Sequence, residues 1–174
     1  MKYRYIYKTP DAFSDLIMLS DGESLTGLYF EGTREKLKID TSGEEILLPV
    51  FMDTAGWLDI YFGGREPDFI PKYVLNNLSP FRKAVTEHML EVGFGELKTY
   101  GEIASKIALE TGKLKMSAQA VGGAVGHNPI SIIIPCHRII GSGFSLTGYG
   151  GGIDNKIALL ELEGHDPLKF RVPK

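Results

Sequence analysis

The sequence contains a single cysteine, Cys136, among its 174 residues. One cysteine excludes an intrachain disulfide and any zinc site built from several cysteines. The chain also has no apolar run of the roughly 20 residues that a membrane-spanning helix needs, and no signal-peptide core follows its N-terminus. We therefore expect a cytoplasmic protein with no membrane partner, in which Cys136 is either a buried structural thiol or a reactive one.

The chain also lacks a net positive charge: its net charge is −3, which by itself does not favour a nucleic-acid partner. The charge is uneven: residues 1–79 carry 8 basic and 13 acidic side chains, residues 80–140 carry 7 and 5, and residues 141–174 carry 4 and 4. With 43% hydrophobic and 24% charged residues the composition is that of a globular protein. The length suits one domain or two small ones.

The N-terminal part is predicted to be mainly strands. Residues 2–8 are rich in aromatics, and residues 13–30 hold two apolar runs joined by Ser20-Asp21-Gly22-Glu23, in which Asp-Gly favours a hairpin. Asp53 is expected to cap a short helix that ends before residues 63 and 64, both glycine.

From Ser79 onward the pattern predicts helices. Ser79-Pro80 combines an N-cap residue with proline at the first helical position, and an apolar face at helical spacing follows, up to residue 92. Thr99-Tyr100-Gly101-Glu102 has the form of a capping box, with a hydroxyl at the N-cap and a carboxylate three residues later. A last helix is expected over residues 154–163, with glycine 164 ending it.

A short helix over residues 118–125, capped by Ser117, would have almost no side-chain bulk. Together with the helix before it, it resembles a helix-turn-helix with a long connection. Its small residues indicate either close packing against another helix or close approach to a DNA backbone. Both interpretations stay open. The small residues are Ala118, Ala120, Gly122, Gly123 and Ala124.

The β-branched residues 130–134 predict a strand that leads into Pro135-Cys136-His137-Arg138. Nearby histidine and arginine lower the pKa of a thiol, and the thiolate is the nucleophile. Neighbours in an extended strand point to opposite faces, however. Cys136 and His137 can therefore act together only if the chain turns tightly at this point.

These motifs resemble the O6-alkylguanine-DNA alkyltransferase family. The resemblance covers residues 79–165 in order, and weakly residues 58–63. The segments that carry it are Ser79-Pro80-Phe81, Thr99-Tyr100-Gly101-Glu102, Ala120-Val121-Gly122-Gly123-Ala124, Asn128-Pro129, Ile132-Ile133-Ile134-Pro135-Cys136-His137-Arg138, Gly148-Tyr149-Gly150-Gly151-Gly152 and Leu160-Glu161-Leu162-Glu163-Gly164.

The resemblance implies a chemistry for individual residues. Cys136 would attack the alkyl carbon on O6 of guanine, or on O4 of thymine, and keep the alkyl group. His137 would act through a water as its base, and Glu163 would orient the histidine. Asn128 would bond across the turn before Cys136, and Tyr100 would assist departure of the guanine. The resemblance also implies which residues would bind the base, namely Tyr149, Ile139, Gly150 and Ser142.

It also implies an α+β fold, with a ribonuclease H-like β-sheet and helix scaffold at residues 1–78. A winged helix-turn-helix alkyltransferase domain would follow at residues 79–174. A monomer would bind double-stranded DNA in the minor groove with the damaged nucleotide flipped out. The DNA-binding residues would be Thr99, Ala118, Gln119, Ala120, Gly122, Gly123 and Arg138.

The chain departs from the family pattern at three positions. Gln119 stands where an arginine usually fills the gap left by the flipped base, and glutamine stacks less well than a guanidinium. Ser131 stands where some members have proline, and Gly150 where some have serine. These two changes indicate a more open alkyl pocket. Residues 1–79 lack the cysteines of the zinc site found in some members, so we expect neither metal nor cofactor.

Three alternatives compete with a repair protein. A cysteine hydrolase would need an oxyanion hole. Its histidine would usually lie far from the cysteine in the sequence and be brought to it by the fold. A non-enzymatic damage sensor of the same fold would lack the acceptor cysteine, which is present here. A plain helix-turn-helix regulator would need neither Cys136 nor the loop around Tyr149.

Overall fold

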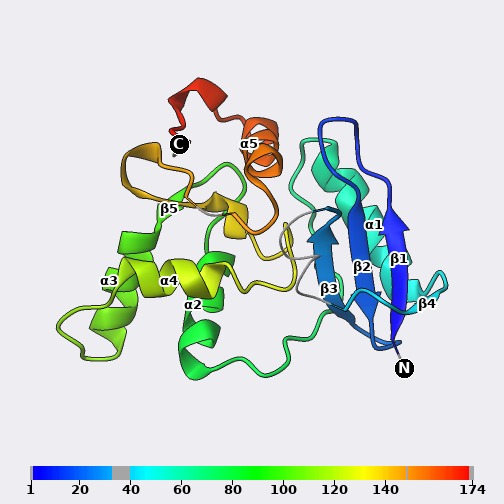
Figure 1. The fold of residues 1–174 in the computed structure, drawn as a ribbon, viewed down its shortest axis with the longest axis horizontal. Helices are drawn as coiled ribbons and strands as arrows, with labels where there is room; N and C mark the ends of the chain where they lie inside the picture. The colour runs from blue at the N-terminus through cyan, green and yellow to red at the C-terminus, as the bar shows by residue number, and fades with distance from the viewer. Residues whose placement is uncertain (1, 33–39, 148, 173–174) are drawn as a thin grey trace. The chain divides into compact units, whose positions relative to one another are not determined.

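A computed structural model describes residues 2–32, 40–147 and 149–172 and shows a mixed α+β fold. The chain divides into two compact units (Figure 1). Unit 1 comprises Met1–Asn76 and Pro129–Ile133, and unit 2 comprises Asn77–Asn128 and Ile134–Lys174. None of the helices in the described ranges is long and apolar enough to cross a membrane.

Unit 1 is built on a four-stranded sheet in the order β3-β2-β1-β4. Strands β1 (Tyr3–Tyr7), β2 (Leu16–Ser20) and β3 (Leu25–Phe30) pair antiparallel, and β4 (Glu44–Glu45) lies parallel to β1. The predicted hairpin joins β2 and β3. Its Asp21 carboxylate accepts the amides of Glu23 and Ser24, and Gly22 takes a φ of 114°.

Helix α1 (Pro49–Phe62) packs on this sheet, with Phe51 stacked 6.0 Å from Tyr5. The prediction that Asp53 caps this helix was wrong. Leu48 is the N-cap and Pro49 occupies the first helical position, which proline favours because its φ is already helical. Asp53 therefore lies exposed one turn inside the helix.

The predicted strand over residues 130–134 was also wrong. Of these residues only Ile130 forms an isolated bridge, to Leu28, and residues 131–133 form a turn. Ile132 has a φ of 69°, which a β-branched residue rarely adopts. The amide of Ile133 bonds to the carbonyl of Ser131, two residues back, and not to a partner strand. The run is apolar because these residues are buried, and a buried turn can be as apolar as a buried strand.

Unit 2 consists of helices around a short parallel pair of strands. Helices α2 (Pro80–Leu90), α3 (Tyr100–Glu110), α4 (Ala118–Val125) and α5 (Ile153–Leu162) accompany β5 (Lys98–Thr99) and β6 (Ile139–Ile140). Short 3₁₀ turns span Cys136–Arg138 (η2), Ser142–Phe144 (η3) and Pro167–Lys169 (η4). Helices α3 and α4 lie side by side (Figure 1).

The predicted helix caps of unit 2 are confirmed. The Ser79 and Ser117 hydroxyls accept the amides of Arg82 and Ala120. Thr99 and Glu102 form the complete capping box. Helix α5 ends as expected, with Glu163 as C-cap and glycine 164 at a φ of 90°.

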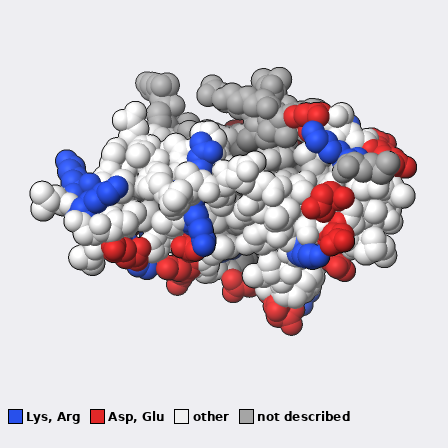
Figure 2. All heavy atoms as spheres, turned by 90° about the horizontal axis from the view of Figure 1, so that it is seen from below, with Lys and Arg blue, Asp and Glu red and all other residues white. Residues whose placement is uncertain are grey.

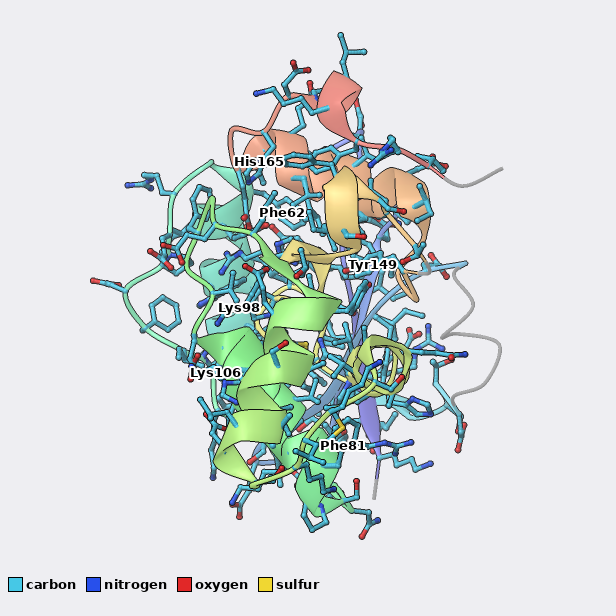
Figure 3. All side chains as sticks on the ribbon, turned by 90° about the vertical axis from the view of Figure 1, so that its left-hand side faces the viewer. Phe62, Phe81, Lys98, Lys106, Tyr149 and His165 are labelled. Carbon is cyan, nitrogen blue, oxygen red and sulfur yellow. The ribbon has the colours of Figure 1, made fainter. Side chains whose placement is uncertain are left out.

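A buried histidine joins α2 to α3. His88 lies with Nδ1 3.2 Å from a Glu91 oxygen and Nε2 2.9 Å from a Glu110 oxygen. Glu91 also accepts from Lys106 at 2.7 Å and from Lys98 at 3.4 Å; both lysines are labelled in Figure 3. The Lys106 hydrogen bond is the main cause that lowers the pKa of Glu91 to about 2. This network joins α2 to the C-terminal half of α3, through Lys106 and Glu110.

Candidate active site

Cys136 is 4% exposed and opens the turn η2. The Arg138 amide closes this turn on the Pro135 carbonyl at 3.0 Å. The tight turn that Cys136 and His137 need is therefore present. Asn128 spans the same bend: its side-chain nitrogen lies 2.9 Å from the Ile134 carbonyl and 3.0 Å from Cys136 Sγ. An amide NH₂ has two hydrogens to donate, and a donor at sulfur stabilises the thiolate.

Glu163, at the end of α5, is hydrogen-bonded to the side chains of the two residues that follow Cys136. His137 Nε2 lies 2.8 Å from Glu163 Oε1. Arg138 donates from Nε to both carboxylate oxygens and from a terminal nitrogen to Oε1, at 3.0–3.1 Å. The Gly95 amide adds a bond of 3.1 Å to Oε2. All three ionisable side chains of this cluster are buried.

Burial sets the charge state of this cluster. Desolvation is the main cause that holds the pKa of His137 below its usual value, against the opposing hydrogen bond to Glu163. For Glu163, burial acts to raise the pKa, but the hydrogen bonds from His137 and Arg138 outweigh it and hold the pKa well below its usual range. The cluster is therefore an ionised Glu163–Arg138 pair with a neutral His137. Since Nε2 faces the carboxylate, it carries the hydrogen and Nδ1 is the basic nitrogen.

Arg138, which was predicted to bind DNA, is largely buried. Its side chain is 9% exposed, and its guanidinium is held by Glu163 and by the Val92 carbonyl at 2.7 Å. The guanidinium also lies 5.8 Å from the centre of the Phe94 ring. Because its charge is paired with the buried Glu163, Arg138 helps to order that carboxylate; its predicted contact with DNA stays a prediction.

Lys156 is a residue of this site that the sequence analysis missed. It is fully buried in α5 and donates to the Ile139 carbonyl at 2.6 Å. Its ammonium lies 5.4 Å from the Tyr149 ring centre and 6.0 Å from that of Tyr100. Desolvation lowers its pKa to about 8, and the nearby negative charge of Cys136 partly opposes this.

Helical spacing could have revealed Lys156. It lies three, four and seven residues before Leu159, Leu160 and Glu163, all buried, and therefore shares the inner face of α5. A lysine on such a face indicates a specific role, because lysine is rarely buried without a partner.

Two tyrosines flank the thiol. The Tyr149 hydroxyl lies 3.9 Å from Cys136 Sγ, and Tyr100 donates its hydroxyl to the Thr147 carbonyl at 3.2 Å. Burial, with a smaller contribution from Cys136, raises the pKa of Tyr100 to about 12. Tyr100 therefore keeps its proton at neutral pH and can act as a hydrogen-bond donor.

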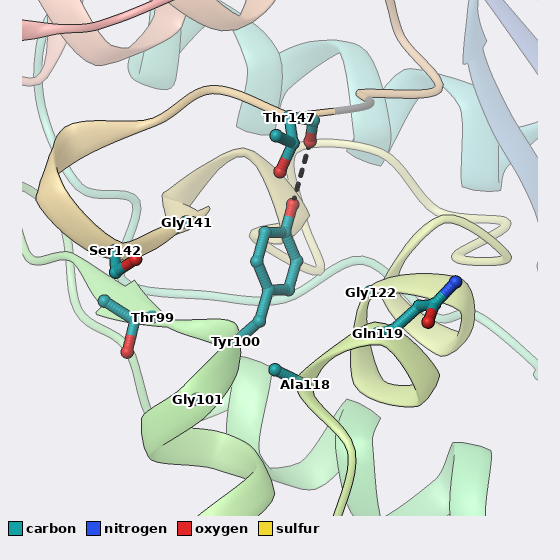
Figure 4. A pocket seen from close by; sticks show the side chains of 9 residues that line it. All are labelled: Thr99, Tyr100, Gly101, Ala118, Gln119, Gly122, Gly141, Ser142 and Thr147. Atoms are coloured by element: carbon teal, nitrogen blue, oxygen red, sulfur yellow. Dashed lines mark hydrogen bonds between the residues drawn. The ribbon is translucent and has the colours of Figure 1, made fainter. Parts of the chain in front are cut away.

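Tyr100 also forms one wall of an open pocket of about 510 Å³ within unit 2 (Figure 4). Cys136 is not among its lining residues, so Tyr100 connects the pocket to the thiol, which lies deeper. A pocket of this volume is typical for a small ligand. The lining residues are Thr99, Tyr100, Gly101, Ala118, Gln119, Gly122, Gly141, Ser142 and Thr147.

Helix α4 presents its small residues to this pocket and to solvent. Ala118, Gln119, Ala120 and Gly123 are exposed. A Cβ on Gly123 would meet nothing within 4 Å, and one on Gly122 would touch only the Tyr100 ring, at 3.8 Å. Close packing against another helix is therefore not the reason for these two glycines.

The remaining predicted base-binding residues lie on the loops around the site. Ser142 lines the pocket and Gly150 lies in the turn before α5. The Ile139 carbonyl, predicted to bind the base, already accepts Lys156; a carbonyl oxygen has a second lone pair. Ser131 is fully buried in unit 1 and is not among the pocket residues. The glycine at 148 lies outside the described residues.

Comparisons with known proteins indicate the family of the chain. The family model "6-O-methylguanine DNA methyltransferase, DNA binding domain" matches residues 80–165. A methylated-DNA–protein-cysteine methyltransferase of Haemophilus influenzae is 41% identical over 155 residues, which is 88% of this chain and 83% of that protein. The crystal structure of Mycobacterium tuberculosis O6-methylguanine methyltransferase matches with a TM-score of 0.77 at 38% identity, covering 94% of this chain and 93% of that one. The same organism's OGT in complex with DNA matches with a TM-score of 0.74 at 34% identity, covering 97% and 94%.

Proposed function

The chain belongs to the methylated-DNA–protein-cysteine methyltransferase family, and we propose that it repairs DNA by transferring an alkyl group to Cys136. The group would come from O6 of guanine, and also from O4 of thymine. One observation carries the assignment of the acceptor. Cys136 Sγ accepts a hydrogen bond from the Asn128 side-chain amide. The next two residues of the turn, His137 and Arg138, both bond to Glu163.

The first step is formation of the thiolate. His137 accepts the thiol proton at Nδ1 through a water, because its ring is neutral and its Nε2–H is engaged by Glu163. The Asn128 N–H and the buried ammonium of Lys156 then stabilise the negative charge on sulfur. Arg138 keeps Glu163 ionised and in place, so it acts as a positioning residue.

The second step is a direct displacement. An Sγ–C bond forms to the alkyl carbon while the C–O6 bond breaks, and its electron pair remains on the guanine. Tyr100 donates a hydrogen bond to the departing ring, and Tyr149 bonds near O6, as their positions beside the thiol support. The product at Cys136 is a thioether, which has no easy hydrolytic route back. Each protein molecule is therefore consumed in one reaction.

We propose further that the substrate base is flipped out of double-stranded DNA into the pocket beside Tyr100. The exposed, slender face of α4 supports its entry into the minor groove, with Gln119 filling the gap in the base stack. The connection between α3 and α4 exposes Lys113 and Lys115. Figure 2 shows basic groups at the end of unit 2 where this connection lies. These lysines would bind phosphates next to α4.

The finer fold assignment is also a proposal. Helices α3 and α4 would be a helix-turn-helix of the winged type, and unit 1 a ribonuclease H-like scaffold. The antiparallel order of β1–β3 with a parallel β4 supports the second part. We expect the protein to act as a monomer.

The test is a mass measurement on Cys136. The protein is incubated with duplex DNA that contains one O6-methylguanine, and the peptide that holds Cys136 is weighed. We expect it to gain one methyl group per molecule while the lesion becomes guanine. The matched control is Cys136→Ser, which should leave the lesion intact.

Two outcomes would overturn the proposal. An unmodified Cys136 peptide with an intact lesion would exclude repair by this chain. Repeated product release from one protein molecule would instead indicate a hydrolase.

A further inference from the structure

The C-terminal tail of unit 2 is bonded to the loop that precedes Tyr149. The Arg171 amide donates to the Phe144 carbonyl and the Leu146 amide donates to the Arg171 carbonyl, both at 2.9 Å. The Arg171 guanidinium donates from Nε to the Gly143 carbonyl at 2.8 Å, and a terminal nitrogen donates to the same oxygen. We name residues 165–171 the C-terminal strap and residues 141–147 the pocket loop.

The pocket loop has a conformation that needs external support. Its tight bend is closed by the Gly141 amide on the Ser145 carbonyl at 2.7 Å. Gly143 has a φ of 62° and Phe144 a φ of 60°. Left-handed backbone is unfavourable for phenylalanine and persists only where its surroundings hold it. The strap supplies such contacts, since the Phe170 ring lies 6.2 Å from that of Phe144.

Loop and strap also fit each other closely at Gly143. A Cβ on this residue would lie 1.9 Å from a terminal nitrogen of Arg171, so the guanidinium occupies the space of a side chain. Phe170 packs at the same time against the buried cluster that contains Leu146 and Leu160. His165, labelled in Figure 3, lies 6.1 Å from Phe170. The strap is thus anchored in the core of unit 2 and reaches the loop from there.

The pocket loop in turn places groups of the candidate active site. Thr147 directly follows Leu146, and its carbonyl accepts the Tyr100 hydroxyl (Figure 4). Gly141 and Ser142, at the start of the loop, also line the pocket. The strap therefore touches the loop one residue before the group that orients Tyr100.

We propose that the C-terminal strap positions the pocket loop to receive the alkylated base, and that Arg171 is a positioning residue for alkyl transfer. The proposal rests on the proposed function. Arg171 is exposed and acts through the loop backbone, so its loss should leave the Cys136 network intact. It should change how the base and Tyr100 are held after the DNA has bound.

The test compares Arg171→Ala with Lys169→Ala, an exposed lysine of the same strap, in single-turnover transfer from O6-methylguanine in duplex DNA. We expect Arg171→Ala to lower the limiting rate at saturating DNA roughly tenfold, the loss expected for a charge-assisted hydrogen bond. The half-saturating DNA concentration and the rate of Cys136 alkylation by iodoacetamide should stay as in the wild type. Lys169→Ala should match the wild type in all three.

A second arm uses the fit at Gly143. Gly143→Ala should slow transfer more in the wild-type background than in the Arg171→Ala background, because the added methyl group would displace the flexible guanidinium from the loop; the strain at a φ of 62° is common to both backgrounds. The proposed role of the strap would be overturned if Gly143→Ala slowed transfer equally in both backgrounds. It would also be overturned if Arg171→Ala and Lys169→Ala had equal transfer rates.

If the wild type itself takes up no methyl group, the proposed function fails and no variant rate is interpretable as transfer. Hydrogen exchange at the Leu146 amide then tests the strap separately. Faster exchange in Arg171→Ala would support its hold on the loop, and unchanged exchange would exclude it.

Discussion

Replacing Lys156 by methionine removes a fully buried ammonium and keeps most of the length of the side chain. Burial lowers the pKa of Lys156 from 10.5 to about 8 in the folded protein, although the charge of Cys136 acts in the opposite direction. In the unfolded chain the lysine is solvated, and it keeps its proton up to a pH near 10.5. The substitution therefore changes how stability depends on pH.

The direction follows from proton binding. Below pH 8 both states hold the proton, and the folded state carries the full cost of the buried charge. Between about pH 8 and 10.5 the unfolded chain binds more protons, so the free energy of unfolding rises with pH. At about 1.4 kcal/mol per pH unit the gain across this window is roughly 3 kcal/mol. Lys156→Met lacks the gain.

Urea unfolding followed by circular dichroism at several pH values from 7 to 10.5 measures the effect. We expect the stability of the wild type relative to Lys156→Met to increase by about 3 kcal/mol across the window. Taking this difference cancels the titration of the tyrosines, which both proteins share. Lys169→Met, which removes an exposed lysine, is the matched control and should give a curve parallel to the wild type. If the curve of stability against pH for Lys156→Met is also parallel to that of the wild type, the claim that Lys156 is buried with a lowered pKa is refuted.

Three further predictions concern the site. Asn128→Ala should slow methylation of Cys136 by about tenfold, since loss of one hydrogen bond to a charged sulfur costs about 1.5 kcal/mol or more; a single-turnover assay measures it, and an unchanged rate would contradict the role of the amide. Glu163→Gln should destabilise the fold by about 3–5 kcal/mol because it leaves Arg138 buried without its partner. The pKa of Glu163 is depressed by folding, so its contribution in the wild type should begin to decline as the pH falls below about 4.5 and continue to decline toward the much lower folded pKa; the difference in stability between the two proteins should shrink progressively over this range. Gln119→Arg should tighten binding to lesion-bearing duplex DNA several-fold in low salt, with a steeper salt dependence; fluorescence anisotropy tests this, and equal affinity would exclude residue 119 from the DNA face.

Local chemistry explains where prediction from the sequence succeeded. A hydroxyl before a helix bonds to amides two or three residues away, so Ser79, Thr99 and Ser117 mark helix starts without reference to the rest of the chain. The same rule wrongly predicted Asp53 as a cap. Pro49 starts the helix one turn earlier, and the apolar face of α1 extends back to Val50.

Near the thiol, contacts between distant segments decide what the sequence pattern leaves open. Residues 130–134 are apolar because they are buried, and burial does not distinguish a strand from a turn with an isoleucine at positive φ. Arg138 carries a charge that suits DNA, but the fold places Glu163 against it, 25 residues away in the chain. The charge of Lys156 by itself favours exposure, although its spacing matches the buried face of α5.

The single cysteine, together with the motifs around it, is enough to indicate the family and the acceptor residue, because these depend on residue identity and order. The surroundings of the sulfur depend on contacts between distant segments. The fold directs the Asn128 amide at Cys136, buries Lys156 beside two tyrosines, turns Arg138 inward to Glu163 and ties the pocket loop to Arg171. Hydrogen bonds and desolvation between such segments arise only when the chain is packed, so no local pattern in the sequence could specify them.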